Sequence, residues 1–165
     1  VLGIGYPGGA PMDRLSRTGD AGRYAFPRVQ VHDAPLDMSF SGLKTAAINL
    51  IHNARQKEEA LDLPSLAASF SAAVSDMLVP RVMEAARRCG RRKVAVAGGV
   101  AANSRIRADL EAACAAAGCR LYLPPLSLCG DNGAMIGCQA YYEYLAGHTA
   151  DMALNAYANR DIAKG

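Results

Sequence analysis

Two short apolar runs separated by one helix-length segment constrain the fold of this chain more than any other feature. The first run, at residues 93–97, ends in a glycine pair, and the second, at residues 120–123, ends in two prolines. The segment between them, residues 104–117, is predicted to be helical and to stop at Gly118. Two strands joined by a helix favour parallel pairing in one sheet. We therefore expect an α/β fold.

The remaining periodic segments predict a chain that is rich in helix. Apolar residues recur at helical spacing between glycine, proline and serine signals, and these place helices at residues 10–18, 43–57, 64–89 and 131–145. Ser41 is the expected N-cap of the second helix. Pro80 lies well inside the third helix and should kink it or split it in two.

The other segments predict little regular structure. Residues 20–41 should form an irregular connection with a short extended piece at 28–31, and residues 148–165 an irregular tail. The run at 93–97 is continuous, which is typical of a strand covered on both faces. Because two strands make too small a sheet to stand alone, further strands are expected before Val1. We therefore interpret residues 1–165 as a single lobe of a larger protein.

Positive charge is concentrated in one stretch of the chain. The net charge is only +3, but five cations fall within seven residues: Arg87, Arg88, Arg91, Arg92 and Lys93. One interpretation is a helix end whose cations complement the helix dipole, followed by a solvated loop. The other is a contact with the phosphate backbone of an RNA.

The cysteine pattern and the hydropathy pattern indicate the compartment. The five cysteines contain no Cys-x-x-Cys pair, so neither a zinc knuckle nor a disulfide framework is expected. They are interpreted as buried thiols of a reducing cytoplasm. No apolar run approaches the roughly twenty residues of a membrane span, and no signal peptide opens the chain. We expect a cytoplasmic protein with no membrane partner.

Two stretches, residues 96–103 and 128–136, combine a glycine turn with the start of a helix. This geometry exposes unpaired backbone N–H groups and a partial positive charge, which suits a phosphate. Gly98 and Gly99 would let a ligand approach the backbone. Asp131, at the expected start of the last helix, is either an N-cap or one ligand of a metal ion. The three histidines lack the spacing of a shared metal site, so further ligands would lie off this chain.

Four motifs in order resemble one known family. They are Tyr-Pro-Gly-Gly, Met-Ser-Phe-Ser-Gly-Leu-Lys-Thr, Ala-Gly-Gly-Val-Ala-Ala-Asn and Leu-Cys-Gly-Asp-Asn-Gly-Ala-Met-Ile, at residues 6–9, 38–45, 97–103 and 128–136. Together they are similar to the C-terminal part of the tRNA threonylcarbamoyladenosine transferase family TsaD, once called the glycoprotease or O-sialoglycoprotein endopeptidase family. The resemblance implies the partial C-terminal lobe of an actin-like ATPase (ribonuclease H-like) fold.

The resemblance also implies an activity and roles for particular residues. The family transfers a threonylcarbamoyl group from its adenylate to N6 of adenosine next to the anticodon of ANN-decoding tRNAs. Gly98, Gly99 and Asn103 correspond to the turn that contacts the nucleotide. Asp131 corresponds to the aspartate that completes a divalent metal site, iron or zinc, with two histidines of an N-terminal lobe. The implied partners are tRNA and subunits of the TsaB and TsaE type.

Two alternatives to an RNA-modifying transferase remain open. The older family name suggests a metal-dependent O-sialoglycoprotein endopeptidase, although this chain has no zincin histidine motif. A non-catalytic lobe that docks partner subunits through apolar helix faces is the other alternative. The chain taken alone is expected to be inactive, and it is expected to self-associate if strands that normally cover its sheet are absent.

Overall fold

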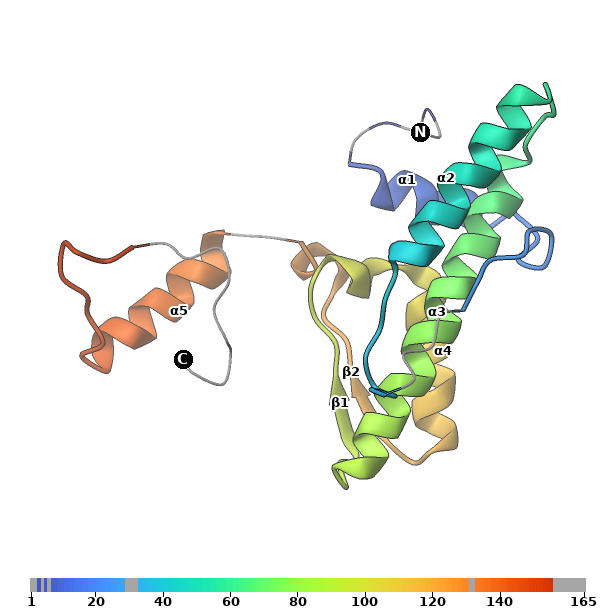
Figure 1. Ribbon diagram of the computed structural model, residues 1–165. Coiled ribbons are helices and arrows are strands. Elements are labelled where there is room, and N and C mark those ends of the chain that lie inside the picture. Colours follow the sequence, from blue (N-terminus) through green and yellow to red (C-terminus); the bar gives the residue numbers. More distant parts are fainter. Residues whose placement is uncertain (1–2, 4, 6, 29–32, 131–132, 156–165) are drawn as a thin grey trace. The chain divides into compact units, whose positions relative to one another are not determined.

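A computed structural model describes residues 3, 5, 7–28, 33–130 and 133–155 of the chain (Figure 1). The chain forms two compact units, Val1–Gly130 and Asp131–Gly165, and each is described by itself. The larger unit contains, in order, α1 (Gly9–Ser16), α2 (Ser41–Gln56), α3 (Leu63–Arg88), β1 (Lys93–Ala95), the 3₁₀ helix η1 (Gly99–Ala102), α4 (Ser104–Ala116), β2 (Arg120–Tyr122) and the 3₁₀ helix η2 (Leu126–Leu128).

The two strands pair in parallel, as the sequence predicted. Lys93 lies opposite Arg120, and the register continues to Ala95 opposite Tyr122. The crossover between the strands contains α4, so the helix-rich α/β fold with a small parallel sheet is confirmed.

Helices cover one face of this sheet. Val94 of β1 is buried in a cluster with Ala86 of α3 and Cys114 of α4. Its neighbours Lys93 and Ala95 are exposed on the opposite face. Within the larger unit, β1 is covered on one face only, because its side chains alternate between the helices and solvent, so the expectation of a strand covered on both faces is not met within this unit.

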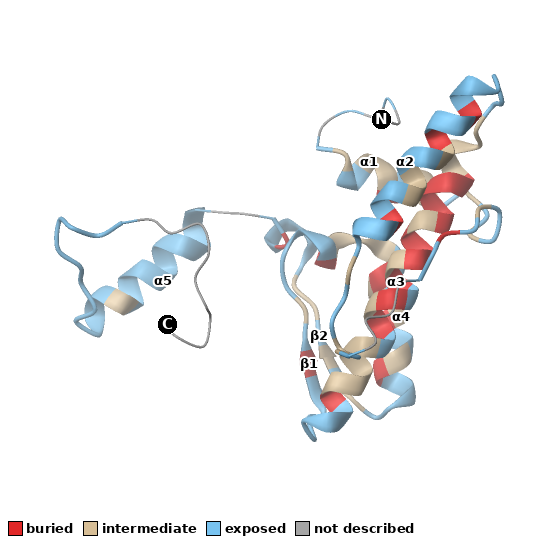
Figure 2. Cartoon of the chain, viewed as in Figure 1, coloured by how far each residue is buried: buried red, intermediate tan, exposed pale blue. Residues whose placement is uncertain are grey.

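The long helix α3 is the centre of the larger unit. Its first half packs on α2 through Leu66, Ala73 and Met77, and its second half packs on Ile106 and Leu110 of α4. Figure 2 shows buried residues along most of α3. By length and composition α3 could cross a membrane, but 56% of its most apolar window is buried inside this unit. Its apolar composition is accounted for by its position between other helices.

Serines on α3 bind the connection that follows α1. The backbone N–H of Asp20 donates to the Ser65 hydroxyl at 3.0 Å, and the N–H of Tyr24 donates to the Ser69 hydroxyl at 3.2 Å. Both serines are buried, so these bonds satisfy polar groups that would otherwise be costly to bury. They hold the irregular connection against the helix.

Of the two outcomes expected for Pro80, a kink or a split of the helix, the split is wrong, and the N-cap expected at Ser41 is also wrong. Pro80 does not split α3, which is one helix from Leu63 to Arg88, because packing along both halves outweighs the hydrogen bond that proline removes. The Arg81 guanidinium also donates to the Met77 carbonyl at 2.6 Å in this turn. Ser41 is not the N-cap of α2: the helix begins at Ser41 itself, and no side chain caps it.

The smaller unit contains α5 (Gly133–Leu145). None of its residues is buried, and residues 148–155 contain no helix or strand. The predicted extended piece at 28–31 and the last ten residues of the predicted tail lie outside the described residues, apart from Arg28. The interpretation of the whole chain as a single lobe stays a prediction.

We predict that Gly19→Ala destabilises the larger unit. A Cβ at Gly19 would lie 2.1 Å from the backbone carbonyl carbon of Pro64, so the connection would have to move off α3. Overpacking of this kind costs about 1–3 kcal/mol or more. Thermal melts should show a lower melting temperature for Gly19→Ala than for the wild type. The control Gly9→Ala, where a Cβ meets nothing within 4 Å, should melt at the same temperature as the wild type. Equal melting temperatures would contradict the described contact.

Candidate functional site

The first glycine-containing stretch and the residues that lead to the second start from one edge of the sheet. β1 leads into Gly98 and η1, and β2 leads through Pro124 and Pro125 into η2. Because the strands are parallel, their carboxyl ends lie at the same edge, where ligands of parallel α/β sheets bind. The stretch at 96–103 and the segment that precedes residue 131 therefore start from the same edge.

Arg107 of α4 holds both segments. Its Nε donates to the Ala101 carbonyl in η1, and its Nη2 donates to the Pro124 carbonyl after β2. The same Nη2 lies 3.6 Å from the Sγ of Cys129, which is buried. One guanidinium thus fixes the turn after β1 relative to the loop after β2. The sequence analysis missed Arg107; its place one helical turn after Asn103 is the signal that could have suggested it.

The turn after β1 has the backbone of a ligand-binding turn. Gly98 has φ +87° and ψ 176°, a conformation that is nearly restricted to glycine. Gly99 has no such constraint, and a Cβ there would meet nothing within 4 Å. Gly98, Gly99 and Val100 are exposed, and the N–H groups of Gly99 and Val100 have no hydrogen-bond partner among the described residues. These groups can bind an anion.

Asn103 is the N-cap of α4. Its Oδ1 accepts a hydrogen bond from the backbone N–H of Ile106 at 3.0 Å. The Nδ2 amide donor has no partner among the described residues, and the side chain is partly exposed. Asn103 can therefore cap the helix and donate to a ligand at the same time.

A carboxylate of the chain itself closes the N-terminus of α4. Asp13 of α1 is buried, and its Oδ1 accepts hydrogen bonds from the Ser104 backbone N–H at 2.7 Å and from the Ser104 hydroxyl at 2.8 Å. Its Oδ2 accepts from Arg17 at 2.7 Å. Burial acts to raise the pKa of Asp13, but the bonds from Ser104 and Arg17 outweigh burial and hold the pKa below its ordinary value.

The expectation of unpaired N–H groups at this helix start is wrong for two of them. The N–H groups of Ser104 and Ile106 are already bonded to Asp13 and Asn103, and an anion at the helix end would meet the Asp13 carboxylate. The sequence analysis missed Asp13, since nothing local to a short helix indicates a contact 91 residues along the chain. Among the described residues, the exposed turn and the Asn103 amide still offer donors at this edge.

The proposed metal ligand lies outside the described residues. Asp131 and Asn132 are among those not described, so its interpretation as a cap or as a ligand is open. Among the residues that are described, no group of three or more His, Cys, Asp or Glu side chains could hold a metal ion. His52 is exposed on α2, and His148 bonds to Glu143 at 2.6 Å. All five cysteines are free, but the expectation that they are buried holds only for Cys114 and Cys129: Cys119 is half-buried, and Cys89 and Cys138 are exposed.

The predicted RNA-contact cations fall into two groups. Arg87 and Arg88, in the last turn of α3, each donate to Glu84 at 2.7 Å. Hydrogen bonds from Arg87 and Arg88 lower the pKa of Glu84 to about 2. These two arginines therefore fit the interpretation of a helix end whose cations complement the helix dipole, and they also pair with a carboxylate of the same helix. Arg91, Arg92 and Lys93 lie beyond the helix, at the opposite edge of the sheet from Gly98.

Comparison with known proteins identifies similar chains. A family model described as TsaD, tRNA N6-adenosine threonylcarbamoyltransferase, matches residues 1–138. Curated proteins named tRNA N6-adenosine threonylcarbamoyltransferase are 47% identical over 156 residues in Moorella thermoacetica and 45% identical over 162 residues in Staphylococcus saprophyticus. These matches cover 94% and 98% of this chain but only 46% and 47% of the relatives. The chain therefore spans somewhat less than half the length of the relatives.

We predict that Asn103→Asp separates the capping role of this residue from ligand binding. Aspartate caps about as well as asparagine but lacks the amide donor, so the melting temperature should be kept while ATP affinity falls by about 1–3 kcal/mol, the cost of a buried hydrogen bond. Asn103→Ala should lose affinity and also about 1 kcal/mol of stability. Calorimetry and thermal melts measure the two effects.

The matched control is Asn53→Asp, which makes the same charge change on the exposed side of α2. It should bind ATP like the wild type. If the wild type and Asn103→Asp bind ATP equally, or if neither binds it measurably, the role of Asn103 is limited to capping α4.

Proposed function

Because the chain belongs to the tRNA N6-adenosine threonylcarbamoyltransferase family, we propose that it forms part of an enzyme that transfers a threonylcarbamoyl group to tRNA. The proposed donor is threonylcarbamoyl-adenylate, and the proposed acceptor is N6 of the adenosine next to the anticodon in ANN-decoding tRNAs. The chain spans less than half of its relatives, so this activity is proposed for the whole protein. The isolated chain is expected to be inactive.

The proposed reaction is an acyl transfer to an amine. The N6 nitrogen attacks the carbamoyl carbon, a C–N bond forms, and the bond between that carbon and the phosphate oxygen breaks. AMP leaves with the bonding electron pair, and N6 loses a proton. In this scheme the residues of the chain bind and orient the adenylate, and N–H donors near its phosphate stabilise the charge of the leaving group.

One observation carries this proposal most directly. At the carboxyl edge of the sheet, the exposed turn offers the unpartnered N–H groups of Gly99 and Val100 together with the Asn103 amide. Three donors within five residues of chain suit the phosphate and the ribose of an adenylate. Arg107 fixes this turn through the Ala101 carbonyl, and Asp13 fixes α4 through the Ser104 N–H.

The proposed setting is the C-terminal lobe of a two-lobed, actin-like ATPase fold with the nucleotide between the lobes. The small parallel sheet and its helices support that assignment. We propose Asp131 as one ligand of a divalent metal, iron or zinc, whose other ligands are histidines of the other lobe. The described residues do not complete such a site, so their proposed role is limited to holding the adenylate.

The other partners follow from the family and from the thiols. Subunits of the TsaB and TsaE type are proposed as protein partners, with tRNA as the substrate. The free state of all five cysteines supports a reducing cytoplasm. Self-association of the isolated chain is proposed from its exposed apolar side chains, which include Val100, Leu126, Ile136 and Tyr144. No described feature favours the endopeptidase alternative.

A chimera tests the transferase proposal. In the Moorella thermoacetica relative, the segment that matches this chain would be replaced by residues 1–165. We expect the folded chimera to convert unmodified tRNA, given synthetic threonylcarbamoyl-adenylate, to a product whose modified adenosine is detected by nucleoside mass spectrometry. Asp131→Asn in the chimera should keep the melting temperature of the metal-free protein and lose bound metal and product.

The chimera has clear contrary outcomes. A chimera that melts cooperatively but modifies no tRNA, next to an active relative, would contradict the proposed function. Full metal content and activity in the Asp131→Asn chimera would reduce Asp131 to a cap. Release of peptides from a sialoglycoprotein, abolished by a chelator, would favour the endopeptidase instead.

A further inference from the structure

We propose that the outer face of the β1–β2 sheet, with the loop that leads into it, docks a single-stranded segment of RNA. This surface, called the basic sheet face, consists of Lys93, Arg120 and Tyr122 on the strands and of Arg91 and Arg92 on the loop that leads into β1. The choice of RNA rests on the proposed function, because a tRNA is the expected substrate. Charge and geometry at the amino ends of the strands point to the surface itself.

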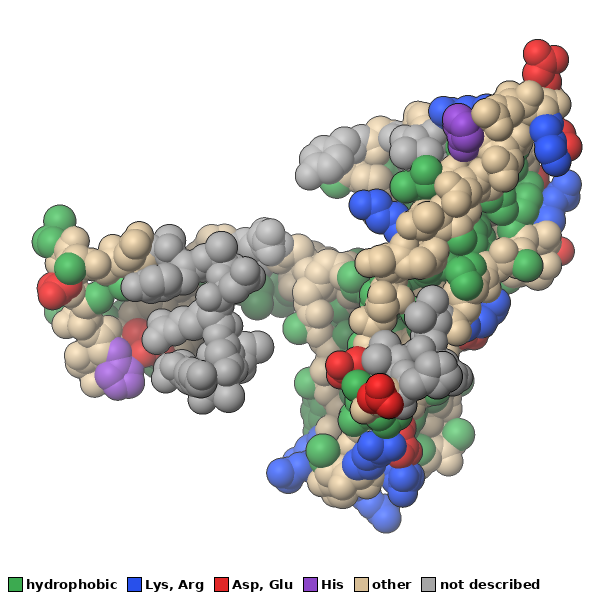
Figure 3. Space-filling view, in the orientation of Figure 1, with side chains coloured by type: hydrophobic (Ala, Val, Ile, Leu, Met, Phe, Trp, Pro, Cys, Tyr) green, Lys and Arg blue, Asp and Glu red, His purple; other side chains and the backbone are tan. Residues whose placement is uncertain are grey.

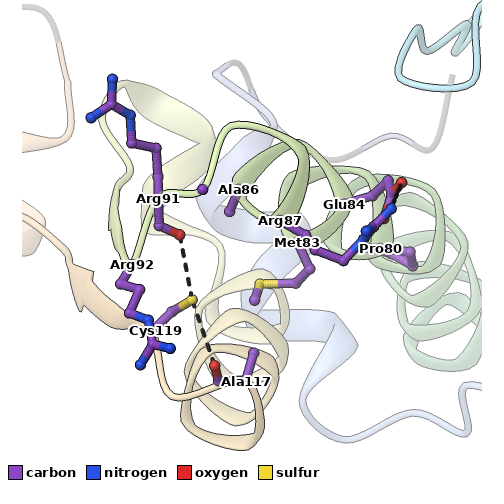
Figure 4. A pocket seen from close by; sticks show the side chains of 10 residues that line it. Pro80, Met83, Glu84, Ala86, Arg87, Arg91, Arg92, Ala117 and Cys119 are labelled. Atoms are coloured by element: carbon purple, nitrogen blue, oxygen red, sulfur yellow. Dashed lines mark hydrogen bonds and ion pairs between the residues drawn. The ribbon is translucent and has the colours of Figure 1, made fainter.

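The charge of this region is not balanced by acidic side chains among the described residues. Arg91 and Arg92 line an open hollow of about 640 Å³ between the ends of α3 and α4. Figure 4 shows both arginines on the loop after α3, apart from Glu84 and Arg87 on the helix. Glu84 is the one acidic residue among the described residues that line the hollow, and it is already bonded to Arg87 and Arg88.

The register of the sheet places two further cations opposite each other. Lys93 of β1 pairs with Arg120 of β2, and both are exposed. Like charges directly across a sheet repel and destabilise it, and strands lie only about 4.8 Å apart. Neither side chain has an ion-pair partner among the described residues. A bound polyanion would turn this repulsion into attraction.

An aromatic ring lies on the same face. Arg120 and Tyr122 are two residues apart on β2, so their side chains share the outer face with Lys93. The Arg120 guanidinium lies over the Tyr122 ring, 5.0 Å from its centroid, and Tyr122 is 40% exposed. Unpaired bases stack on tyrosine rings and on guanidinium planes, whereas duplexes hide their bases. The combination of cations and an exposed ring therefore fits an RNA loop.

The space-filling view agrees with this placement. In Figure 3, Lys and Arg side chains gather at the lower end of the larger unit, where α3 ends and β1 begins in Figure 1. This end of the strands is opposite the edge that carries Gly98 and Asn103. RNA docking and nucleotide binding can therefore be perturbed separately.

Fluorescence anisotropy with a labelled RNA stem–loop, titrated over a range of salt concentrations, tests the proposal in the complete 165-residue chain. Each cation that contacts a phosphate of a single strand contributes about −0.7 to the slope of log K against log salt. The triple variant Arg91→Gln, Arg92→Gln, Lys93→Gln should reduce the size of the slope by about 2. Tyr122→Leu should weaken binding of the stem–loop, leave the slope unchanged, and leave binding of a blunt duplex unchanged.

Two controls remove charge elsewhere. Arg14→Gln removes an exposed cation of α1, and Arg88→Gln removes one that Glu84 neutralises. Both should leave the slope unchanged. Asn103→Asp should leave RNA binding unchanged, and the triple variant should leave ATP affinity unchanged.

Four results would contradict the proposal that the basic sheet face docks RNA. They are no RNA binding by the wild type, an unchanged slope in the triple variant, an equal fall in slope in Arg14→Gln, or equally tight binding of phosphatidylserine vesicles that the triple variant also loses. Any of these can occur while the chimera remains active, in which case the proposed function stands. Conversely, an inactive chimera together with the expected RNA slopes would contradict the proposed transferase function but support the RNA-docking surface.

Discussion

The buried carboxylate of Asp13 at the N-terminus of α4 is the interaction on which the arrangement of the site depends. It joins α1 to α4, the helix that follows the turn at Gly98 and Gly99, through two hydrogen bonds to Ser104. Burial of a charge is costly unless it is paired and hydrogen-bonded, and here Ser104, Arg17 and the helix dipole supply those partners. Without this contact, the N–H and the hydroxyl of Ser104 would lose their partner, and α4 would have a less restricted position against α1.

The position of Asp13 determines which groups can meet a nucleotide. Because the helix end is occupied by a carboxylate, the donors that the described residues offer at this edge include the N–H groups of Gly99 and Val100 and the amide of Asn103. Arg107 then fixes the turn relative to the loop after β2. The opposite edge of the sheet carries unbalanced cations instead. The two ends of one small sheet thus have different chemistry, with neutral donors at one and positive charge at the other.

Much of the fold could be predicted from local signals. Both strands, their parallel pairing and the extent of α4 follow from apolar runs and from stop signals such as Gly90 and Gly118, which have φ +60° and φ +65°. Predictions from local sequence failed where tertiary packing determines the structure. Pro80 lies in an unbroken α3 because neighbours cover both halves of the helix. The two 3₁₀ helices were missed because three or four residues carry too little pattern.

The candidate site was predictable only in part. Gly98 and Asn103 lie at a strand end and a helix start, which the sequence shows directly. The role of Asp13 depends on a contact 91 residues away, and that of Arg107 on carbonyls from two loops, so neither has a local signature. Which of the clustered cations are paired could not be predicted without the position of Glu84, which pairs with Arg87 and Arg88.

The pKa of Asp13, measured from its carboxyl carbon by NMR titration, tests this account most directly when combined with melts of Asp13→Asn. We expect a pKa below 3.8, because Ser104 and Arg17 favour the ionised form over the opposing effect of burial. A group whose pKa is lowered by folding stabilises the protein above its unfolded pKa and loses that effect as the pH falls through its folded pKa. Asp13→Asn should therefore be less stable than the wild type at pH 7, with the difference shrinking as the pH falls below about 4. A pKa at or above 3.8, with a stability difference that does not change with pH, would contradict the account.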